Sequence, residues 1–182
     1  MNKNIEKEYK ILLTKDQFTA LTAHYPNLNF IRQINTYYDT EDMSIRASKG
    51  AMRIREKEGS FIFTLKKHST EGLLEYECEV AANHSSIFEQ EDIQALLNSY
   101  QIEGPLHQIA ELITDRAAID TGFAELCFDI SSYNGITDYE IEYEYKKDHD
   151  GLSCFQKILE PIGVQYQKNC TSKIQRALNS ML

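Results

Sequence analysis

Within residues 136–147, positions 138–145 alternate strictly between two kinds of side chain, with a period of two residues. Four acidic residues take one set of positions, and three tyrosines and an isoleucine take the other: Asp138, Glu140, Glu142 and Glu144, against Tyr139, Ile141, Tyr143 and Tyr145. Successive side chains of a β-strand point to opposite faces, so this pattern predicts a strand with one acidic and one apolar face. Like charges that share a face repel one another, so the acidic face calls for a further explanation.

The same separation of charge from apolar side chains recurs in other period-two segments. Charged residues share a face within each segment or occupy it singly: Glu6, Glu8 and Lys10; Arg53 and Arg55; Lys66; Glu75, Glu77 and Glu79; Arg116; and Asp129. For any one strand, the alternative is an ordinary solvated outer face. The segments taken together argue against this alternative. The faces opposite the charged residues are rich in Ile, Leu, Phe and Tyr, and the expected helices need such an apolar surface to cover.

The full pattern predicts one α+β domain over residues 1–182. Strands are expected at 5–13, 32–40, 50–57, 61–68, 73–81, 112–120, 125–131 and 136–147. Helices are expected at 14–25, capped by Thr14, and at 85–100, 152–162 and 172–182, with a short helical piece after Gly104-Pro105. Tight turns are expected at Glu58-Gly59-Ser60 and Tyr133-Asn134-Gly135.

A closed antiparallel β-barrel of about eight strands satisfies both faces, because its apolar sides meet helices packed outside and its charged sides line the interior. Unpaired buried charge costs several kcal/mol per ion, so such an interior must stay wet or bind a charged ligand. The acidic residues are hard oxygen donors suited to Mg²⁺ or Mn²⁺. The basic residues suit phosphate oxygens, and two arginines at i, i+2 can grip one polyphosphate chain.

Composition narrows the possible partners and location. The formal net charge of -9 argues against a general nucleic-acid footprint. No apolar run approaches a membrane span, the first residues are polar, and the four cysteines form no CxxC pair, so we expect a cytoplasmic protein. A Gly-rich phosphate loop of the P-loop type is absent. The expected partner is a small molecule that carries phosphate groups, and the chain is expected to be a monomer or a homodimer.

Several ordered motifs support a family resemblance over essentially the whole chain. They are Glu6-Lys7-Glu8-Tyr9-Lys10, Tyr37-Tyr38-Asp39-Thr40, Met52-Arg53-Ile54-Arg55, Thr64-Leu65-Lys66, Glu75, Arg116, Asp129, Glu140-Ile141-Glu142 and Ser172-Lys173. In this order and spacing the chain resembles the CYTH domain proteins, or triphosphate tunnel metalloenzymes, and is most similar to their small bacterial triphosphatase branch. Thr114 departs from the pattern, since some members carry a second basic residue there.

The resemblance implies a tunnel of eight antiparallel strands and a metal-dependent triphosphatase. Its implied partner is a small-molecule triphosphate substrate, either inorganic tripolyphosphate or an organic triphosphate such as thiamine triphosphate or NTP. It implies these substrate-binding residues: Lys10, Arg53, Arg55, Lys66, Arg116 and Lys173. It implies these ligands for Mg²⁺ or Mn²⁺: Glu6, Glu8, Asp129, Glu140 and Glu142. Lys66 and Glu75 are the candidate catalytic residues, with Glu75 expected to orient a basic residue through an ion pair. A class IV adenylyl cyclase and a non-catalytic polyphosphate or nucleotide sensor remain alternatives.

Overall fold

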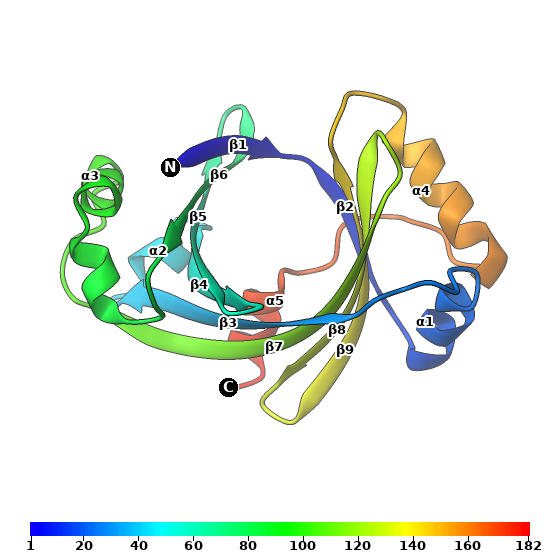
Figure 1. Cartoon of the computed structure of the whole chain (residues 1–182), viewed down its shortest axis with the longest axis horizontal. Coiled ribbons are helices and arrows are strands. Elements are labelled where there is room, and N and C mark those ends of the chain that lie inside the picture. The colour runs from blue at the N-terminus through cyan, green and yellow to red at the C-terminus, as the bar shows by residue number, and fades with distance from the viewer. The chain divides into compact units, whose positions relative to one another are not determined.

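The computed structural model describes residues 1–182 and contains nine β-strands, five α-helices and two short 3₁₀ helices (Figure 1). The strands are hydrogen-bonded in the order β1-β6-β5-β4-β3-β7-β8-β9-β2. The chain divides into two compact units. Unit 1 comprises Met1–Glu6, Gln33–Leu112 and Leu182, and unit 2 comprises Lys7–Arg32 and Ile113–Met181. The α+β class expected from the sequence is confirmed.

Unit 1 is a set of antiparallel strands with one helix-covered face. Its strands are β1 (Asn2–Glu6), most of β3 (Ile31–Thr40), β4 (Ala51–Lys57), β5 (Ser60–Ser69), β6 (Gly72–Val80) and the first half of β7 (Leu106–Asp120). Its helices are α2 (Ser44–Ala47), η1 (Ser85–Glu89) and α3 (Glu91–Ser99). Met52, Ile54 and Phe63 pack against Phe88 and Ile93 in one buried cluster, which leaves the alternate side chains of β4 and β5 on the opposite face.

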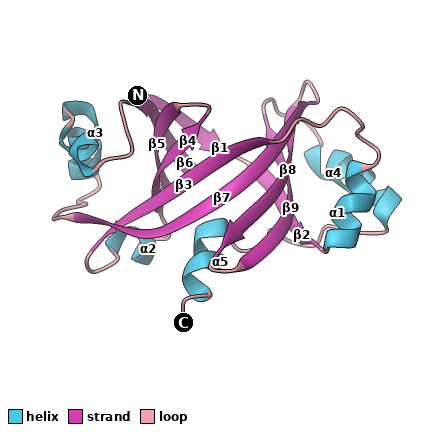
Figure 2. Ribbon diagram, turned by 60° about the horizontal axis from the view of Figure 1, so that its bottom comes forward, coloured by secondary structure: helices cyan, strands magenta, loops and turns pink.

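Unit 2 is built in the same way. Its strands are β2 (Glu8–Leu13), the second half of β7, β8 (Ala124–Tyr133) and β9 (Ile136–Tyr145). Its helices are α1 (Lys15–Thr22), α4 (Gly151–Leu159), η2 (Glu160–Ile162) and α5 (Lys173–Asn179). Helices α1 and α4 lie next to β2, β8 and β9 (Figure 2). Phe18 and Phe155 from these helices bury Phe128 and Ile141 of the sheet.

Local sequence signals explain several element ends. Thr14 and Gln17 form the capping box of α1, in which each side chain accepts a hydrogen bond from the other residue's backbone N–H. The two-residue turn between β4 and β5 places Glu58 at φ 50° and Gly59 at φ 79°. The turn between β8 and β9 places Asn134 at φ 47° and Gly135 at φ 77°. Two positive φ values in succession are typical of the hairpin turns expected there.

The structure corrects three expected elements and adds one that was not expected. The strand expected at 5–13 is interrupted at Lys7, because β1 pairs with β6 whereas β2 pairs with β9. This interruption gives nine strands in place of about eight. The helix expected at 85–100 is divided into η1 and α3 at Gln90, whose ψ of 135° is extended. The short helical piece expected after Pro105 is instead the beginning of β7, and the short helix α2 was not expected.

None of the helices is long and apolar enough to cross a membrane.

Candidate functional site

Three carboxylates meet on the polar face of unit 2. Asp129 lies directly opposite Glu140 in the β8–β9 pair, and Glu142 follows two residues later on the same face of β9. One ligand oxygen from each residue lies within 4.8 Å of the others, so together they could hold a metal ion. Asp129 is 0% exposed, Glu140 1% and Glu142 7%. We call these three residues the acidic triad.

Two basic residues reach into the acidic triad from different elements. Arg116 of β7 lies opposite Asp129 and binds it in a bidentate manner, with Nε 2.7 Å from Oδ1 and Nη2 2.5 Å from Oδ2. Lys173, in the first turn of α5, places its Nζ 2.8 Å from both Asp129 Oδ2 and Glu140 Oε1 and 2.5 Å from Glu142 Oε1. Arg116 and Lys173, both predicted to bind phosphate, therefore donate to carboxylates in this structure.

Arg176 is a third cation at the acidic triad and was not among the site residues predicted from the sequence. Its Nη2 lies 2.5 Å from Glu140 Oε2, and its Nε lies 2.8 Å from Asp138 Oδ2. The available signal was its spacing from Lys173, since residues at i and i+3 share a helix face. With Arg176 included, every carboxylate oxygen of the acidic triad accepts from a lysine or arginine nitrogen.

Burial and neighbouring charges shift the pKa values of the three carboxyl groups in different directions. Burial raises the pKa of Asp129 and of Glu142, but Arg116 and Lys173 outweigh it, and both pKa values end below their usual range. Burial also raises the pKa of Glu140, Lys173 opposes it, and the Glu142 charge adds to the increase, which brings the pKa to about 7. Glu140 is therefore the member of the triad that changes protonation near neutral pH.

Lys10 and Glu8 form an ion pair within the same unit. The Lys10 Nζ lies 2.5 Å from Glu8 Oε1. Burial lowers the pKa of Lys10, but Glu8 and Glu142 raise it further, so this amine is charged. Lys10 also lies opposite Glu142 in the β2–β9 pair. Unit 2 thus holds seven of the predicted site residues: Glu8, Lys10, Arg116, Asp129, Glu140, Glu142 and Lys173.

Unit 1 holds the other predicted site residues on its own polar face: Glu6, Arg53, Arg55, Lys66 and Glu75. Lys66 lies between two carboxylates, with its Nζ 2.6 Å from Glu6 Oε2 and 3.1 Å from Glu75 Oε2. Glu75 is directly opposite Lys66 in the β5–β6 pair. The structure therefore shows an ion pair between the two candidate catalytic residues.

The paired arginines, Arg53 and Arg55, have neighbours on β3 that were not among the predicted site residues. Tyr37 lies opposite Arg53 and hydrogen-bonds it. Asn35 lies opposite Arg55 and accepts a hydrogen bond from its Nε at 2.8 Å. The Nε of Arg53 is buried without a hydrogen-bond partner. The alternation of polar residues along β3 was the signal that could have identified Tyr37 and Asn35, once β3 was paired with β4.

Asp39, within the Tyr37-Tyr38-Asp39-Thr40 motif, has a structural role. Its Oδ1 accepts from the backbone N–H groups of Thr40 and Ile45, and its Oδ2 accepts from that of Arg46. These bonds hold the loop that carries α2 and the left-handed Met43. Because the carboxylate is saturated by local backbone donors, it is not a candidate ligand.

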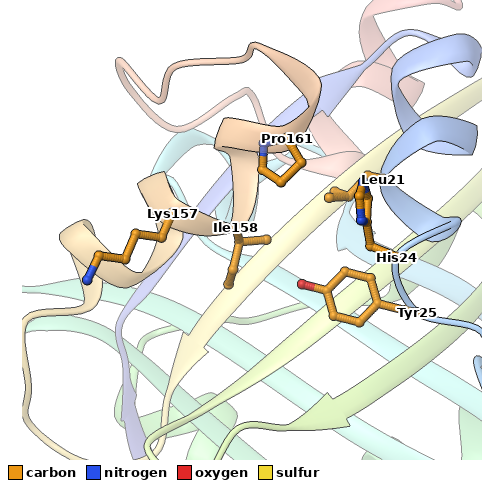
Figure 3. Close-up of a pocket in the computed structure, with 6 residues that line it drawn as sticks. All are labelled: Leu21, His24, Tyr25, Lys157, Ile158 and Pro161. Carbon is orange, nitrogen blue, oxygen red and sulfur yellow. The ribbon is translucent and has the colours of Figure 1, made fainter.

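A pocket of about 300 Å³ lies between α1, α4 and η2 of unit 2, lined by Leu21, His24, Tyr25, Lys157, Ile158 and Pro161 (Figure 3). The amine of Lys157 extends away from the other five side chains. The pocket belongs to the helix-covered side of the sheet, whereas the acidic triad lies on the other face. It gathers no set of convergent charged groups.

Comparison with known proteins identifies the family of this chain. Residues 4–177 match the CYTH domain model, and the chain belongs to the CYTH domain family, the triphosphate tunnel proteins.

Individual relatives extend this result. The chain is 30% identical to Putative triphosphatase YjbK of Bacillus subtilis (strain 168), over 97% of the chain and 95% of that protein. It is 34% identical to the crystal structure described as a putative adenylate cyclase (bh2851) from Bacillus halodurans, with a TM-score of 0.85 over 97% of this chain and 98% of that one. The Hippeastrum protein HpAC1, described as a putative adenylyl cyclase with a dominant triphosphatase activity, is 22% identical to this chain. Its structure aligns with a TM-score of 0.79 over 97% of this chain and 96% of that one. At that identity it supports the fold alone.

Proposed function

We propose that this protein is a metal-dependent triphosphatase that uses Mg²⁺ or Mn²⁺ to hydrolyse a linear triphosphate. The acidic triad is the observation that carries the proposal. Three buried carboxylates within 4.8 Å supply only hard oxygen donors, which fit these two cations and not the softer transition metals. The name of the Bacillus subtilis relative agrees with this activity.

The donor set also fits because its charge is already balanced by groups that a metal ion can replace. Arg116 and Lys173 bring two positive charges to the acidic triad, which equals the charge of one divalent cation. With metal on the triad, both side chains are free to donate to phosphate oxygens without leaving buried carboxylates uncompensated. The proposal gives Lys10, Arg53, Arg55 and Lys66 the same phosphate-binding role.

The proposed reaction transfers the terminal phosphoryl group to water. The new bond joins the water oxygen to the terminal phosphorus, and the water gives up a proton to the phosphate products or to solvent. The bond from that phosphorus to the bridging oxygen breaks, and its electron pair stays on the shortened phosphate chain that leaves. Arginine and lysine donors stabilise the negative charge that develops on the phosphate oxygens. A divalent cation held by the acidic triad would supply further charge neutralisation and would lower the pKa of coordinated water. Glu75 keeps Lys66 in place through the 3.1 Å ion pair.

The remaining predictions from the sequence form part of the proposal. Glu6 and Glu8 are proposed to bind metal as well, although Glu6 pairs with Lys66 and Glu8 with Lys10 in this structure. The closing of the sheet into a barrel, with the charged faces inside, stays a prediction. It would allow the basic residues of both units to serve one substrate, as the resemblance implies.

The test is an activity panel on the purified chain. Tripolyphosphate, thiamine triphosphate and ATP are each assayed with Mg²⁺, Mn²⁺ or a chelator, with phosphate release and cyclic nucleotide measured in parallel. We expect metal-dependent phosphate release that Glu140→Gln and Glu142→Gln abolish. A cyclic product from ATP without phosphate release would establish the cyclase instead, and binding without turnover would establish the sensor. Full activity in both variants would refute the metal centre, and full activity of a Glu6→Gln, Glu8→Gln double variant would refute the role of those two residues.

A further inference from the structure

Gln33 on β3 presents a buried polar atom that the protein does not satisfy. Gln33 is only 3% exposed, and its side-chain oxygen Oε1 has no hydrogen-bond partner. Native proteins leave few buried polar groups unpaired, and a leucine of similar volume would remove the penalty. An unpaired carbonyl oxygen on a candidate binding face therefore indicates a partner that arrives with a ligand.

The strand register places Gln33 beyond the paired arginines. Directly opposite residues share a face, and Gln33 is opposite Lys57, Asn35 is opposite Arg55, and Tyr37 is opposite Arg53. The Gln33 position is thus one step past Arg55 and two steps past Arg53 along the polar face of unit 1. Four residues of strand extend roughly 13 Å. A linear triphosphate has only two bridging oxygens between its outer phosphorus atoms and is shorter than this distance.

This spacing assigns Gln33 to the part of a substrate that follows the phosphates. Phosphate groups held at Arg53 and Arg55 leave the next position, flanked by Lys57, for whatever the triphosphate is attached to. Asn35 cannot take this part, because its Oδ1 already accepts from Arg55 and its Nδ2 donates to the carbonyl of Leu112 at 3.5 Å.

The chemistry of a primary amide then selects the attached group. A glutamine side chain offers one acceptor and one donor side by side. It pairs with a heteroaromatic edge that carries an amino group beside a ring nitrogen, as glutamine does with the N6 and N7 atoms of adenine. On the corresponding edge, a 6-oxo purine presents two acceptors, O6 and N7, and can pair there with only one half of the amide.

We infer that Gln33 is a specificity-determining residue for organic triphosphates whose base carries an amino group next to a ring nitrogen. The inference rests on the proposed function and deepens it, because it names the class of substrate that the site prefers. It also gives a reason for the buried, unpaired carbonyl that packing within the chain does not give.

The test compares ATP with ITP, which differ on this edge by an amino against an oxo group, and uses tripolyphosphate as the substrate without a base. Wild type is expected to favour ATP over ITP by about tenfold in kcat/KM. Gln33→Leu should lower kcat/KM for ATP by about tenfold, lower it less for ITP, which loses one hydrogen bond in place of two, and leave tripolyphosphate unchanged. Its thermal stability should not fall, since the unpaired carbonyl is removed. Gln94→Leu, the same change on the exposed side of α3, should alter no rate.

The outcomes separate this inference from the proposed function. Absence of turnover of every triphosphate with either metal would overturn both. Turnover of tripolyphosphate together with equal rates on ATP and ITP, or an equal loss on all three substrates in Gln33→Leu, would overturn the assignment of Gln33 alone. Should Gln33→Leu fail to fold, Gln33→Asn retains the amide on a shorter stem. It is expected to lose the same preference for ATP, and an unchanged preference in it would overturn the assignment as well.

Discussion

Lys173 is the residue whose removal tests the acidic triad most directly. Its amine lies within 2.8 Å of an oxygen of each triad carboxylate, and burial lowers its pKa less than Asp129, Glu142 and Glu140 raise it. Lys173→Met keeps a long unbranched side chain in α5 and removes the charged amine with its hydrogen bonds to the triad. Because truncating one partner of a buried ion pair leaves uncompensated charge, we expect a loss of about 3–5 kcal/mol in the free energy of unfolding at pH 8.

The same variant should respond more strongly to metal than wild type does. In wild type a divalent cation must compete with the Lys173 amine for the same oxygens, whereas in Lys173→Met that competitor is gone. A ligand that binds only the folded state at one hundred times its Kd stabilises that state by about 2.7 kcal/mol. Mg²⁺ or Mn²⁺ should therefore recover more than half of the lost stability.

The assay is urea unfolding of both proteins with chelator and with each metal, followed by circular dichroism. Lys157→Met serves as the control, because it makes the same change on the exposed side of helix α4. If metal stabilises Lys173→Met no more than it stabilises wild type, the acidic triad is an ion-pair network and not a metal centre. Loss of phosphate release in the variant alone would not decide this point, so the equilibrium measurement carries the test.

Three further predictions follow from particular contacts. Glu140 has a folded pKa of about 7 against 4.5 in the unfolded chain, so the folded state binds more protons between these values and its stability falls as pH rises through that window. The stability of wild type relative to Glu140→Gln, measured by urea unfolding, should therefore fall by up to about 3 kcal/mol from pH 4 to pH 8, and a constant difference would contradict the assignment. Asn35→Ala removes the acceptor for Arg55 Nε and should raise KM for tripolyphosphate several-fold with a smaller change in kcat, which steady-state kinetics will check; an unchanged KM would show that Asn35 does not position Arg55. Asp39→Ala removes the acceptor of three backbone N–H groups and should cost roughly 2–4 kcal/mol of stability by thermal or urea unfolding, and a cost below about 1 kcal/mol would show that the α2 loop is held by other contacts.

The strands and their faces could be predicted from sequence because the signal is local. In β9 the alternation of acidic and apolar residues alone places Glu140 and Glu142 on one face and Ile141 and Tyr143 on the other, and the structure agrees. The interruption at Lys7 could not be predicted, because it depends on which distant strand each half of the segment pairs with. The beginning of β7 was missed for a similar reason, since Leu106 to Ile109 carry too few apolar residues to show alternation without knowledge of their neighbours.

The candidate site shows a sharper limit. The alternation of side chains along the strands correctly indicated that Asp129, Glu140 and Glu142 share a face. It could not indicate which basic residue forms an ion pair with each of them. Arg176 was overlooked because it lies on a helix, where the period-two argument has no force, and its partner Glu140 is 36 residues away. Tyr37 and Asn35 were overlooked because neutral residues give no charge signal. They became visible only through the register that places them opposite Arg53 and Arg55.

The energetics of the acidic triad favour a role beyond folding. Three buried carboxylates and three cations satisfy one another, yet burying six charges is expensive, and apolar residues of similar volume often give equal or greater stability at such positions. The helix-covered face of the same sheet already provides a packed core around Phe128 and Ile141. The fold therefore has no evident need for charge on the opposite face. A metal site would account for these charges. A divalent cation on the acidic triad would replace the two positive charges of Arg116 and Lys173, and both side chains could then donate to phosphate oxygens.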